Sequence, residues 1–471
     1  MEKQTRREFL KKLGFAAASA GTLSISPGCA SIGQANRAGR KRPNIIVIIS
    51  DDMGYADIGC RDIATPNIDS VARNGIRFTN GYVSCPVCSP TRAGLATGRY
   101  QQRFGHEYNT GPPPGGLREQ VGLPLTEVTI ADVLKSAGYV TGAVGKWHLG
   151  LSPHFHPFKR GYDEFFGFLH GGHSYIDPRL GTFNPILRGT KPVDEKEYLT
   201  DAFSREAVAF IERHHDEPFF LYLAYNAVHT PMQAPERYKD SFKHITNAKR
   251  RVYAGMLTAM DEGIGKVLGK VRELGIEENT LLIFVNDNGG PTGANGSDNR
   301  PLRGTKGTMY EGGIRVPFMV QWPRRLKAGQ VYEHPVIALD ILPTATAAAG
   351  GKVPRDRKID GVNLIPYLTG RNKPSPSEGR GKRAPHGTLF WRSGQNHAVR
   401  KGNFKLVKMG AETGLFDLAS DIGESRDLKD ERPDVLKEME KTFERWNSQM
   451  IEPVWTIQRR KKRTPKKKKK T

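Results

Sequence analysis

The sequence predicts an α/β fold in two parts. A large domain has a mostly parallel sheet between helices, and a small C-terminal α+β domain has an antiparallel sheet and a closing helix. Two observations lead to this prediction. Apolar runs alternate with helical patterns across 42–286, and several short strand-like runs precede one amphipathic helix near the end. The length of 471 residues also exceeds what one hydrophobic core usually serves.

The elements of the large domain follow from residue patterns. Four apolar, β-branched runs are typical of strands buried on both faces, at 42–50, 139–144, 218–228 and 280–286. Three stretches carry apolar residues at helical spacing, at 129–138, 201–216 and 253–274. Because strands that alternate with helices usually form parallel sheets, we expect helices on both faces of one sheet.

The C-terminal part begins after a polar stretch rich in proline and glycine at 371–386, which is typical of a linker. Beyond it, the runs GTLFWRS, NHAVRKG and FKLVKM predict short antiparallel strands, and 433–450 predicts the closing helix. We therefore expect four segments: a signal and linker at 1–41, the large domain at 42–375, the small subdomain at 385–455 and a basic disordered tail at 456–471.

The chain is strongly basic, with a formal charge of +23 at pH 7. Ten of the positive charges lie in 459–470, which leaves about +13 for the remainder. A basic body suits a polyanionic partner, whether a substrate, a membrane surface or nucleic acid. The tail has no apolar positions to bury, so we expect it to be a solvated end.

The N-terminal residues resemble an export signal. Arg6 and Arg7, followed by Phe9-Leu10-Lys11 and a run of small apolar residues, match the twin-arginine type. We expect the mature protein to be periplasmic or at the cell surface, with the twin-arginine export machinery as a partner. Cys29 is a candidate lipid attachment site, although Ser26-Pro27 before it fits that pattern poorly.

Polar side chains follow the ends of the four predicted strands. In chain order these are Asp51 and Asp52, Lys146 and His148, His229, and Asp287 and Asn288. Each alone has a plainer interpretation as a cap, a turn or a surface group. Because sites in open α/β sheets lie outside the carboxyl ends of strands, four such coincidences favour one site.

The oxygen donors Asp51, Asp52, Asp287 and Asn288 indicate a hard cation, Ca²⁺ or Mg²⁺, rather than zinc. Buried together, three carboxylates would repel one another strongly without a cation.

Cys88 stands at the start of a predicted helix. Pro90 suits the first turn of a helix through TRAGLATG, so the amides and dipole of the helix would favour an anionic group at Cys88. Arg92 projects one turn further, where it can bind an oxyanion. A redox pair with Cys85 is the alternative, but such a pair needs no neighbouring Arg, Lys, His and carboxylates. A zinc site would need another closely spaced ligand pair, which the sequence lacks.

These motifs together resemble the type I, formylglycine-dependent sulfatases of the alkaline phosphatase superfamily. The signature Cys-x-Pro-x-Arg stands here as Cys88-Ser89-Pro90-Thr91-Arg92. The blocks NIIVIISDDMGYADIGC, GYVTGAVGKWHLG, NAVHTP, FVNDNGG and LRGTKGTMYEGGIRVPF also match, in the family's order. The resemblance spans about 43 to 450 and implies a large alkaline-phosphatase-like domain, with 42–375 as the catalytic part.

The resemblance implies roles for individual residues. Cys88 would be oxidised to formylglycine by a maturation enzyme, and its hydrate would attack sulfur and later expel sulfate. One calcium ion would be held by Asp51, Asp52, Asp287, Asn288 and residue 88. Arg92 and Lys146 would support the hydrate, and His148 would act as a base in the second step. His229 and Lys306 would hold the sulfate and protonate the leaving oxygen.

The substrate suggested by export and a basic body is a sulfated polysaccharide or oligosaccharide, with no nucleic acid expected. His173 and Tyr175, in the stretch HGGHSY, are candidate sugar contacts, although an ordinary turn explains that stretch nearly as well. Two other functions remain open at this stage. One is a phosphodiesterase or phosphonate hydrolase of the same superfamily, and the other is a non-catalytic polyanion-binding protein with unmodified Cys88.

Overall fold

The structure is a computed structural model, which describes residues 42–456 apart from 61, 112–119, 178–183 and 371–383. The export signal, Cys29 and the tail beyond residue 456 therefore lie outside the described residues, as does the predicted linker up to 383. In the part that is described, no helix is both long and apolar enough to cross a bilayer.

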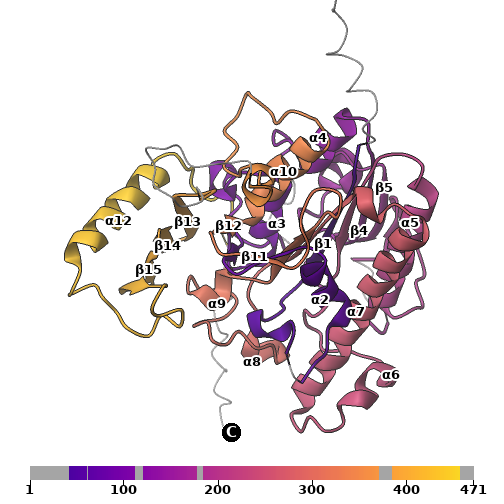
Figure 1. Cartoon of the computed structure of the whole chain (residues 1–471), viewed down its shortest axis with the longest axis horizontal. Coiled ribbons are helices and arrows are strands. Elements are labelled where there is room, and N and C mark those ends of the chain that lie inside the picture. The colour runs from indigo at the N-terminus through magenta and orange to yellow at the C-terminus, as the bar shows by residue number, and fades with distance from the viewer. Residues whose placement is uncertain (1–41, 61, 112–119, 178–183, 371–383, 457–471) are drawn as a thin grey trace, which may run out of the picture. The chain divides into compact units, whose positions relative to one another are not determined.

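The predicted parallel sheet forms the centre of the fold (Figure 1). Within the described residues it has ten strands, in the order β11-β2-β10-β9-β1-β8-β4-β5-β6-β7. The middle run from β9 through β1, β8 and β4 to β5 is parallel throughout. The strands are β1 (Asn44–Ser50), β2 (Ile76–Phe78), β4 (Val140–Lys146), β5 (Glu164–Phe168), β6 (Leu187–Arg188), β7 (Lys191–Pro192), β8 (Phe219–Ala224), β9 (Thr280–Asn286), β10 (Phe318–Gln321) and β11 (Gln330–Tyr332).

Helices cover both faces of this sheet, as the alternating pattern predicts (Figure 1). Alternate residues of β1 point to opposite cores: Ile45 and Val47 pack with α3, α4 and α10, whereas Ile46 and Ile48 pack with α2, α5 and α7. Every residue of β1 is buried, which explains its uninterrupted apolar sequence. The helices are α2 (Pro66–Arg73), α3 (Cys88–Thr97), α4 (Ile130–Ser136), α5 (Leu199–His214), α6 (Glu236–Lys239), α7 (Ala248–Glu273), α8 (Thr292–Asn295), α9 (Glu311–Ile314), α10 (Ile341–Ala348) and α11 (Ile365–Leu368).

The C-terminal subdomain is a four-stranded antiparallel sheet with a closing helix, as predicted. Its elements are β13 (Thr388–Ser393), β14 (Asn396–Lys401), β15 (Phe404–Met409), β16 (Glu412–Asp417) and α12 (Pro433–Asn447). Trp391 and Leu406 belong to the same hydrophobic cluster as Ile45 of the large sheet, and the described residues from Arg42 onward belong to one compact unit. The two predicted domains thus share one core. A further two-stranded sheet pairs β3 (Gly81–Tyr82) with β12 (Val336–Ile337).

Several predicted bounds differ from the structure. The strand predicted over 218–228 ends at Ala224, and Tyr225, Ala227 and Val228 continue as a buried loop. The run is apolar because it is buried, not because it is extended. The helix predicted from 253 begins at Ala248, where the side chain of Asn247 caps it by accepting from the Arg250 amide at 3.1 Å.

His386 provides a pH-dependent link between the two parts of the core. Its Nε2 lies 2.8 and 3.0 Å from the two carboxylate oxygens of Asp340. Burial opposes a charge on the imidazole, but the attraction of Asp340 outweighs it and raises the pKa of His386 above its ordinary value. The pair therefore stabilises the folded state while His386 is protonated.

We predict that His386→Gln destabilises the protein more at low pH than at high pH. Because the folded pKa is raised, the contribution is fully present below about pH 6.5 and is lost as the pH rises through the folded value. Urea denaturation of both proteins from about pH 6 to about pH 9 measures it. A difference in unfolding free energy that stays constant, or grows with pH, would contradict the prediction.

Candidate active site

The carboxylates predicted from the strand ends do lie together. β1 and β9 are parallel neighbours with Ser50 opposite Asn286, so the residues that follow each strand leave the sheet side by side. Asp51, Asp52 and Asp287 are each at most 2% exposed, as is Asn288. The register of two strands therefore concentrates three carboxyl groups in a buried space.

Asn286 fixes the turn that follows β1. The hydroxyl of Ser50 donates to its Oδ1 at 2.9 Å, and its Nδ2 donates to the carbonyl of Met53 at 2.8 Å. The turn includes Asp52 at a φ of 64°, a left-handed backbone that non-glycine residues rarely adopt. The side-chain bridge from β9 holds this turn, so both strands contribute to the placement of the Asp52 carboxylate.

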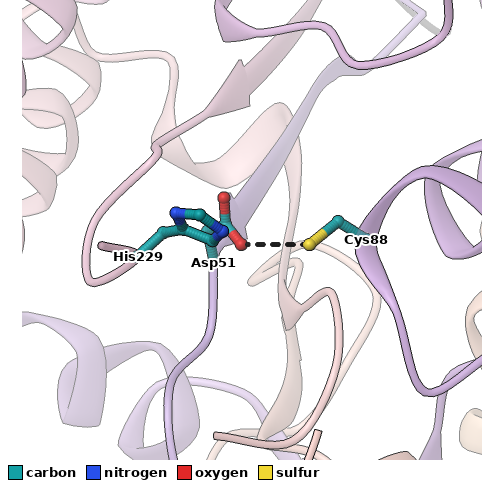
Figure 2. A group of neighbouring side chains, drawn as sticks. All are labelled: Asp51, Cys88 and His229. Carbon is teal, nitrogen blue, oxygen red and sulfur yellow. Dashed lines mark hydrogen bonds between the residues drawn. The ribbon is translucent and has the colours of Figure 1, made fainter. Parts of the chain in front are cut away.

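Cys88 is the first residue of α3, as predicted from Pro90. Its side chain is buried, and its Sγ lies 3.6 Å from Asp51 Oδ1. Figure 2 shows the Asp51 carboxylate and the His229 imidazole close together, with the Cys88 thiol across from them and pointing toward the carboxylate. Burial, followed by the charge of Asp287, raises the pKa of the unmodified Cys88 thiol to about 12. An unmodified Cys88 would therefore remain a neutral thiol.

Three cations pair with the three carboxylates. Arg92 donates to Asp287 through Nε at 3.0 Å and Nη2 at 2.8 Å, and Lys146 donates to Asp51. The ammonium of Lys306 lies 2.5 Å from Asp52 Oδ1 and 3.1 Å from Cys88 Sγ. The cluster is therefore neutral as it stands. Side chains of the protein thus supply cations that offset the repulsion expected among the carboxylates, and the metal ion stays a prediction.

The same residues nevertheless fit a hard cation. One oxygen each from Asp51, Asp52 and Asp287, together with the sulfur of Cys88, lie within 4.8 Å of one another. The Oδ1 of Asn288 is buried and has no hydrogen-bond partner among the described residues, while its Nδ2 donates to Asp52 at 2.7 Å. A buried carbonyl oxygen without a partner is costly, and a calcium or magnesium ion would satisfy it.

His148 lies in a separate wall of the site. Its Nε2 is 3.2 Å from the Thr110 carbonyl, while its Nδ1 is buried without a hydrogen-bond partner in the described part of the chain. Burial, followed by the charge of Lys146, holds the pKa of His148 well below its ordinary value, so the ring is neutral. A neutral imidazole with one nitrogen unoccupied is able to accept a proton.

An open cavity of about 550 Å³ leads to Cys88. It is lined by Cys88, Asn109, Thr110, His148, by residues 170–174, and by Asn184, His229, Thr230 and Pro231. His170 in this wall also has a pKa below its ordinary value, because of burial first and Lys146 second. The pKa of His173 is lowered by burial as well, so the imidazoles of His148, His170 and His173 border the cavity as neutral rings beside amides.

The two candidate sugar contacts lie in different surroundings. His173 lines the cavity, and its two ring nitrogens lie 2.9 Å from the carbonyl oxygens of Ser174 and Asn184. Tyr175 has no exposed surface, and its hydroxyl donates to the carbonyls of Asn226 and His229. Tyr175 therefore does not reach the cavity, contrary to the expectation. It supports the segment that carries His229.

Sequence reasoning missed several residues that border the site. Asn109 and Thr110 belong to a stretch without periodicity, and nothing in the sequence connects them to Cys88. The side chain of Asn109 accepts from the Ser89 amide at 3.0 Å, and the Ser89 hydroxyl lies 2.7 Å from the ring of His106. These contacts hold the first turn of α3. Among these wall residues, only His170 could have been predicted from the sequence, because it lies in the stretch HGGHSY that also contains His173.

The family is decided by comparison with known proteins. The model of the Sulfatase family matches residues 43–351. The chain belongs to the sulfatase family. A second model, described as N-sulphoglucosamine sulphohydrolase, C-terminal, matches residues 305–449. The α/β fold and the membership of the alkaline phosphatase superfamily are thereby confirmed.

Individual relatives agree with this family. Arylsulfatase J of Mus musculus is 36% identical over 343 residues, which are 70% of this chain and 56% of that protein. N-acetylgalactosamine-6-sulfatase of Homo sapiens is 37% identical over 354 residues, which are 69% of this chain and 66% of that protein. The chain therefore spans about half to two thirds of the length of these relatives.

Among solved structures, Ps i-CgsB in complex with k-i-k-neocarrahexaose superposes with a TM-score of 0.82 and 38% identity. That match covers 88% of this chain and 95% of the other.

We predict that Asn288→Ala weakens calcium binding, because it removes the unpartnered buried oxygen and leaves the ion pairs intact. Calorimetric titration with CaCl₂ measures the affinity, and a loss on the order of tenfold or more is expected.

We predict that Asp287→Ala instead lowers the free energy of unfolding by about 3–5 kcal/mol in urea denaturation, because Arg92 is left buried without its partner. Stoichiometric zinc in the purified protein, with neither calcium nor magnesium, would contradict the assignment of the site.

Proposed function

We propose that this chain is a sulfuric ester hydrolase that removes sulfate from a sulfated carbohydrate. The observation that supports this most is the arrangement around Cys88. A residue at a helix N-terminus meets three cations and a set of oxygen donors at the floor of an open cavity. A tetrahedral anion suits this floor, because amides, guanidinium and ammonium groups converge there.

The nucleophile in this proposal is residue 88 after oxidation of Cys88 to formylglycine by a maturation enzyme. The hydrated aldehyde supplies a hydroxyl for attack on sulfur and a second hydroxyl through which sulfate is later expelled. Calcium, held by Asp51, Asp52, Asp287 and Asn288, would add positive charge beside the reacting sulfate. Because the carboxylates are already offset by Arg92, Lys146 and Lys306, a bound ion would give the floor a net positive charge, which would attract an anion.

The other residues have separable tasks. Arg92 is held by Asp287 and Lys146 is held by Asp51, and both cations lie near residue 88. In this proposal they stabilise the charge that develops on the oxygens of residue 88. Lys306 stays protonated: burial lowers its pKa, but its acidic surroundings, among them Asp52 and Asp51, outweigh this and raise the pKa well above its ordinary value. Its ammonium therefore holds the sulfate.

His148 and His229 handle protons in this proposal. The neutral ring of His148 takes the proton from residue 88 in the second step. The Nδ1 of His229 lies 2.6 Å from the Thr230 carbonyl, which accepts its hydrogen, so Nε2, when it also carries a proton, is the nitrogen that passes that proton to the leaving oxygen. The ring is 21% exposed, so a leaving alcohol in the cavity can reach it.

The substrate class follows from the cavity and the relatives. A volume of about 550 Å³ is within the range of small-molecule sites and accommodates a sugar unit, and its opening leaves room for a longer chain. Relatives of this chain are named for N-acetylgalactosamine-6-sulfate, and a similar structure holds a neocarrahexaose. We propose His173 as a sugar contact. We also propose export by the twin-arginine route, to the periplasm or the cell surface.

We predict that Cys88→Ala abolishes sulfate release, while Cys85→Ser retains most of it. The test is a screen of sulfated oligosaccharides with released sulfate as the readout. Intact mass measures the modification, since formylglycine replaces one sulfur and two hydrogens with an oxygen. Substantial turnover by Cys88→Ala would refute the mechanism. Inactivation by Cys85→Ser with residue 88 correctly modified would restore the redox-pair interpretation.

A second prediction concerns Gly171, which faces His148. A Cβ on Gly171 would lie 2.6 Å from Nε2 of His148, so Gly171→Ala must displace the ring. We expect kcat to fall roughly 10- to 100-fold, with little change in melting temperature. Gly269→Ala, where a Cβ meets no atom within 4 Å, is the matched control. Equal kcat values for the two variants would show that the position of His148 does not matter.

A further inference from the structure

Lys306 lies on a loop that is closed at its base. The amide of Gly312 donates to the carbonyl of Arg303 at 2.7 Å, which brings the two ends of 303–312 together. From this loop the Lys306 side chain reaches Asp52 and Cys88. The position of the ammonium therefore depends on how the base of the loop is held.

Glu424, from the C-terminal subdomain, contacts both ends of the loop. Its backbone carbonyl accepts from Arg303 Nη1 at 2.8 Å, and its carboxylate accepts from the Glu311 amide at 2.7 Å. Glu424 is fully buried and has a φ of 51°, an uncommon backbone for this residue type. The surrounding structure therefore fixes this residue, and the residue in turn fixes the base of the loop.

Lys405, on β15, joins the two glutamates. Its ammonium is fully buried and donates to Glu311 and to Glu424 at 2.8 Å each. The second oxygen of Glu311 accepts from the Tyr82 hydroxyl at 2.6 Å and from Arg315 at 3.2 Å. Three segments of the chain thus meet at one carboxylate, and the C-terminal subdomain supplies the cation that also holds Glu424.

This cluster holds two segments together at a considerable cost in desolvation free energy. Buried ion pairs lose hydration that their attraction only partly recovers, and apolar residues of similar volume often stabilise as well or better. Burial alone would raise the pKa of Glu311, but Lys405, Arg315 and Arg400 lower it to about 2, so this carboxylate is ionised. Such a cluster also fixes the relative orientation of the segments that it joins, because each hydrogen bond has a preferred geometry and apolar packing does not.

We propose that Lys405 and Glu424 are positioning residues, which hold the loop so that the Lys306 ammonium lies beside Asp52 and Cys88. This inference rests on the proposed role of Lys306 in holding sulfate. The C-terminal subdomain would then act on the reaction without touching the substrate, through two hydrogen bonds of Glu424 to the ends of one loop.

The test is a double-mutant cycle between this cluster and Lys306. Lys405→Met with Glu424→Gln removes one charge of each sign, so the remaining cluster keeps its balance. We expect kcat/KM for sulfate release to fall on the order of tenfold in the wild-type background. In the Lys306→Ala background the same pair should change kcat/KM by less than about twofold, because the group being positioned is gone. An equal fall in both backgrounds, or no fall in either, overturns the proposal.

The control is a charge-neutral pair on the surface of the same subdomain. Lys401→Met with Glu438→Gln removes an exposed ion pair whose side chains are 45% and 56% exposed, and it should leave kcat/KM unchanged. Should the buried double variant unfold below the assay temperature, Glu424→Gln alone replaces it in the cycle, because it keeps the carbonyl contact with Arg303. The same outcomes then decide.

A crystal structure of the buried variant separates this inference from the proposed function. Displacement of Lys306 from its 2.5 Å contact with Asp52 supports the positioning role even if the enzyme proves to act on another ester. Retention of that contact overturns the positioning role, even where sulfate release is fully established.

Discussion

Three buried carboxylates pair with three cations at the floor of the cavity, and this pairing constrains where several distant segments of the chain must lie. Asp51, Asp52 and Asp287 are buried where two parallel strands end. A carboxylate buried there without a cationic partner would lose its hydration at a large cost in free energy. Arg92 comes from α3, Lys146 from the end of β4 and Lys306 from a distant loop, so charge balance requires three separate segments to converge. A shift of any one of these elements would therefore leave a buried charge without its partner.

Much of the sheet and of the charged floor could be predicted from the sequence, because both follow local rules. An apolar run of five residues, Ile45 to Ile49, shortly before Asp51-Asp52 identifies a buried strand and its end without knowledge of its neighbours. The end of β8 could not be found in this way, because Tyr225 to Val228 are as buried as the strand itself and periodicity cannot separate a buried loop from a buried strand. β16 was missed for the opposite reason, since its sequence ETGLFD is polar and contains a glycine.

The cavity wall was less predictable than its floor, and the reason is also physical. A strand end fixes the direction of the next side chain, but a loop residue such as Tyr175 turns inward or outward according to contacts that are remote in sequence. Here the inward hydroxyl is satisfied by carbonyls of Asn226 and His229, about fifty residues away. The same limitation hid Glu424 and Lys405: their importance lies in long-range contacts with Glu311, and each alone has the appearance of an ordinary surface charge in the sequence.

The floor and the wall of the cavity differ in how freely their residues can be replaced. The floor is held by ion pairs that would each leave a buried charge if one partner were replaced, so its composition is constrained. The wall consists mostly of amides and imidazoles on connecting segments, which lie outside the buried Lys and Arg ion pairs of the floor. His170 and Asn184 can therefore vary without disturbing the cluster beneath them. Under the proposed function, recognition of the anion and recognition of the carbohydrate are therefore physically separable, with the first set by the charged floor and the second by the wall.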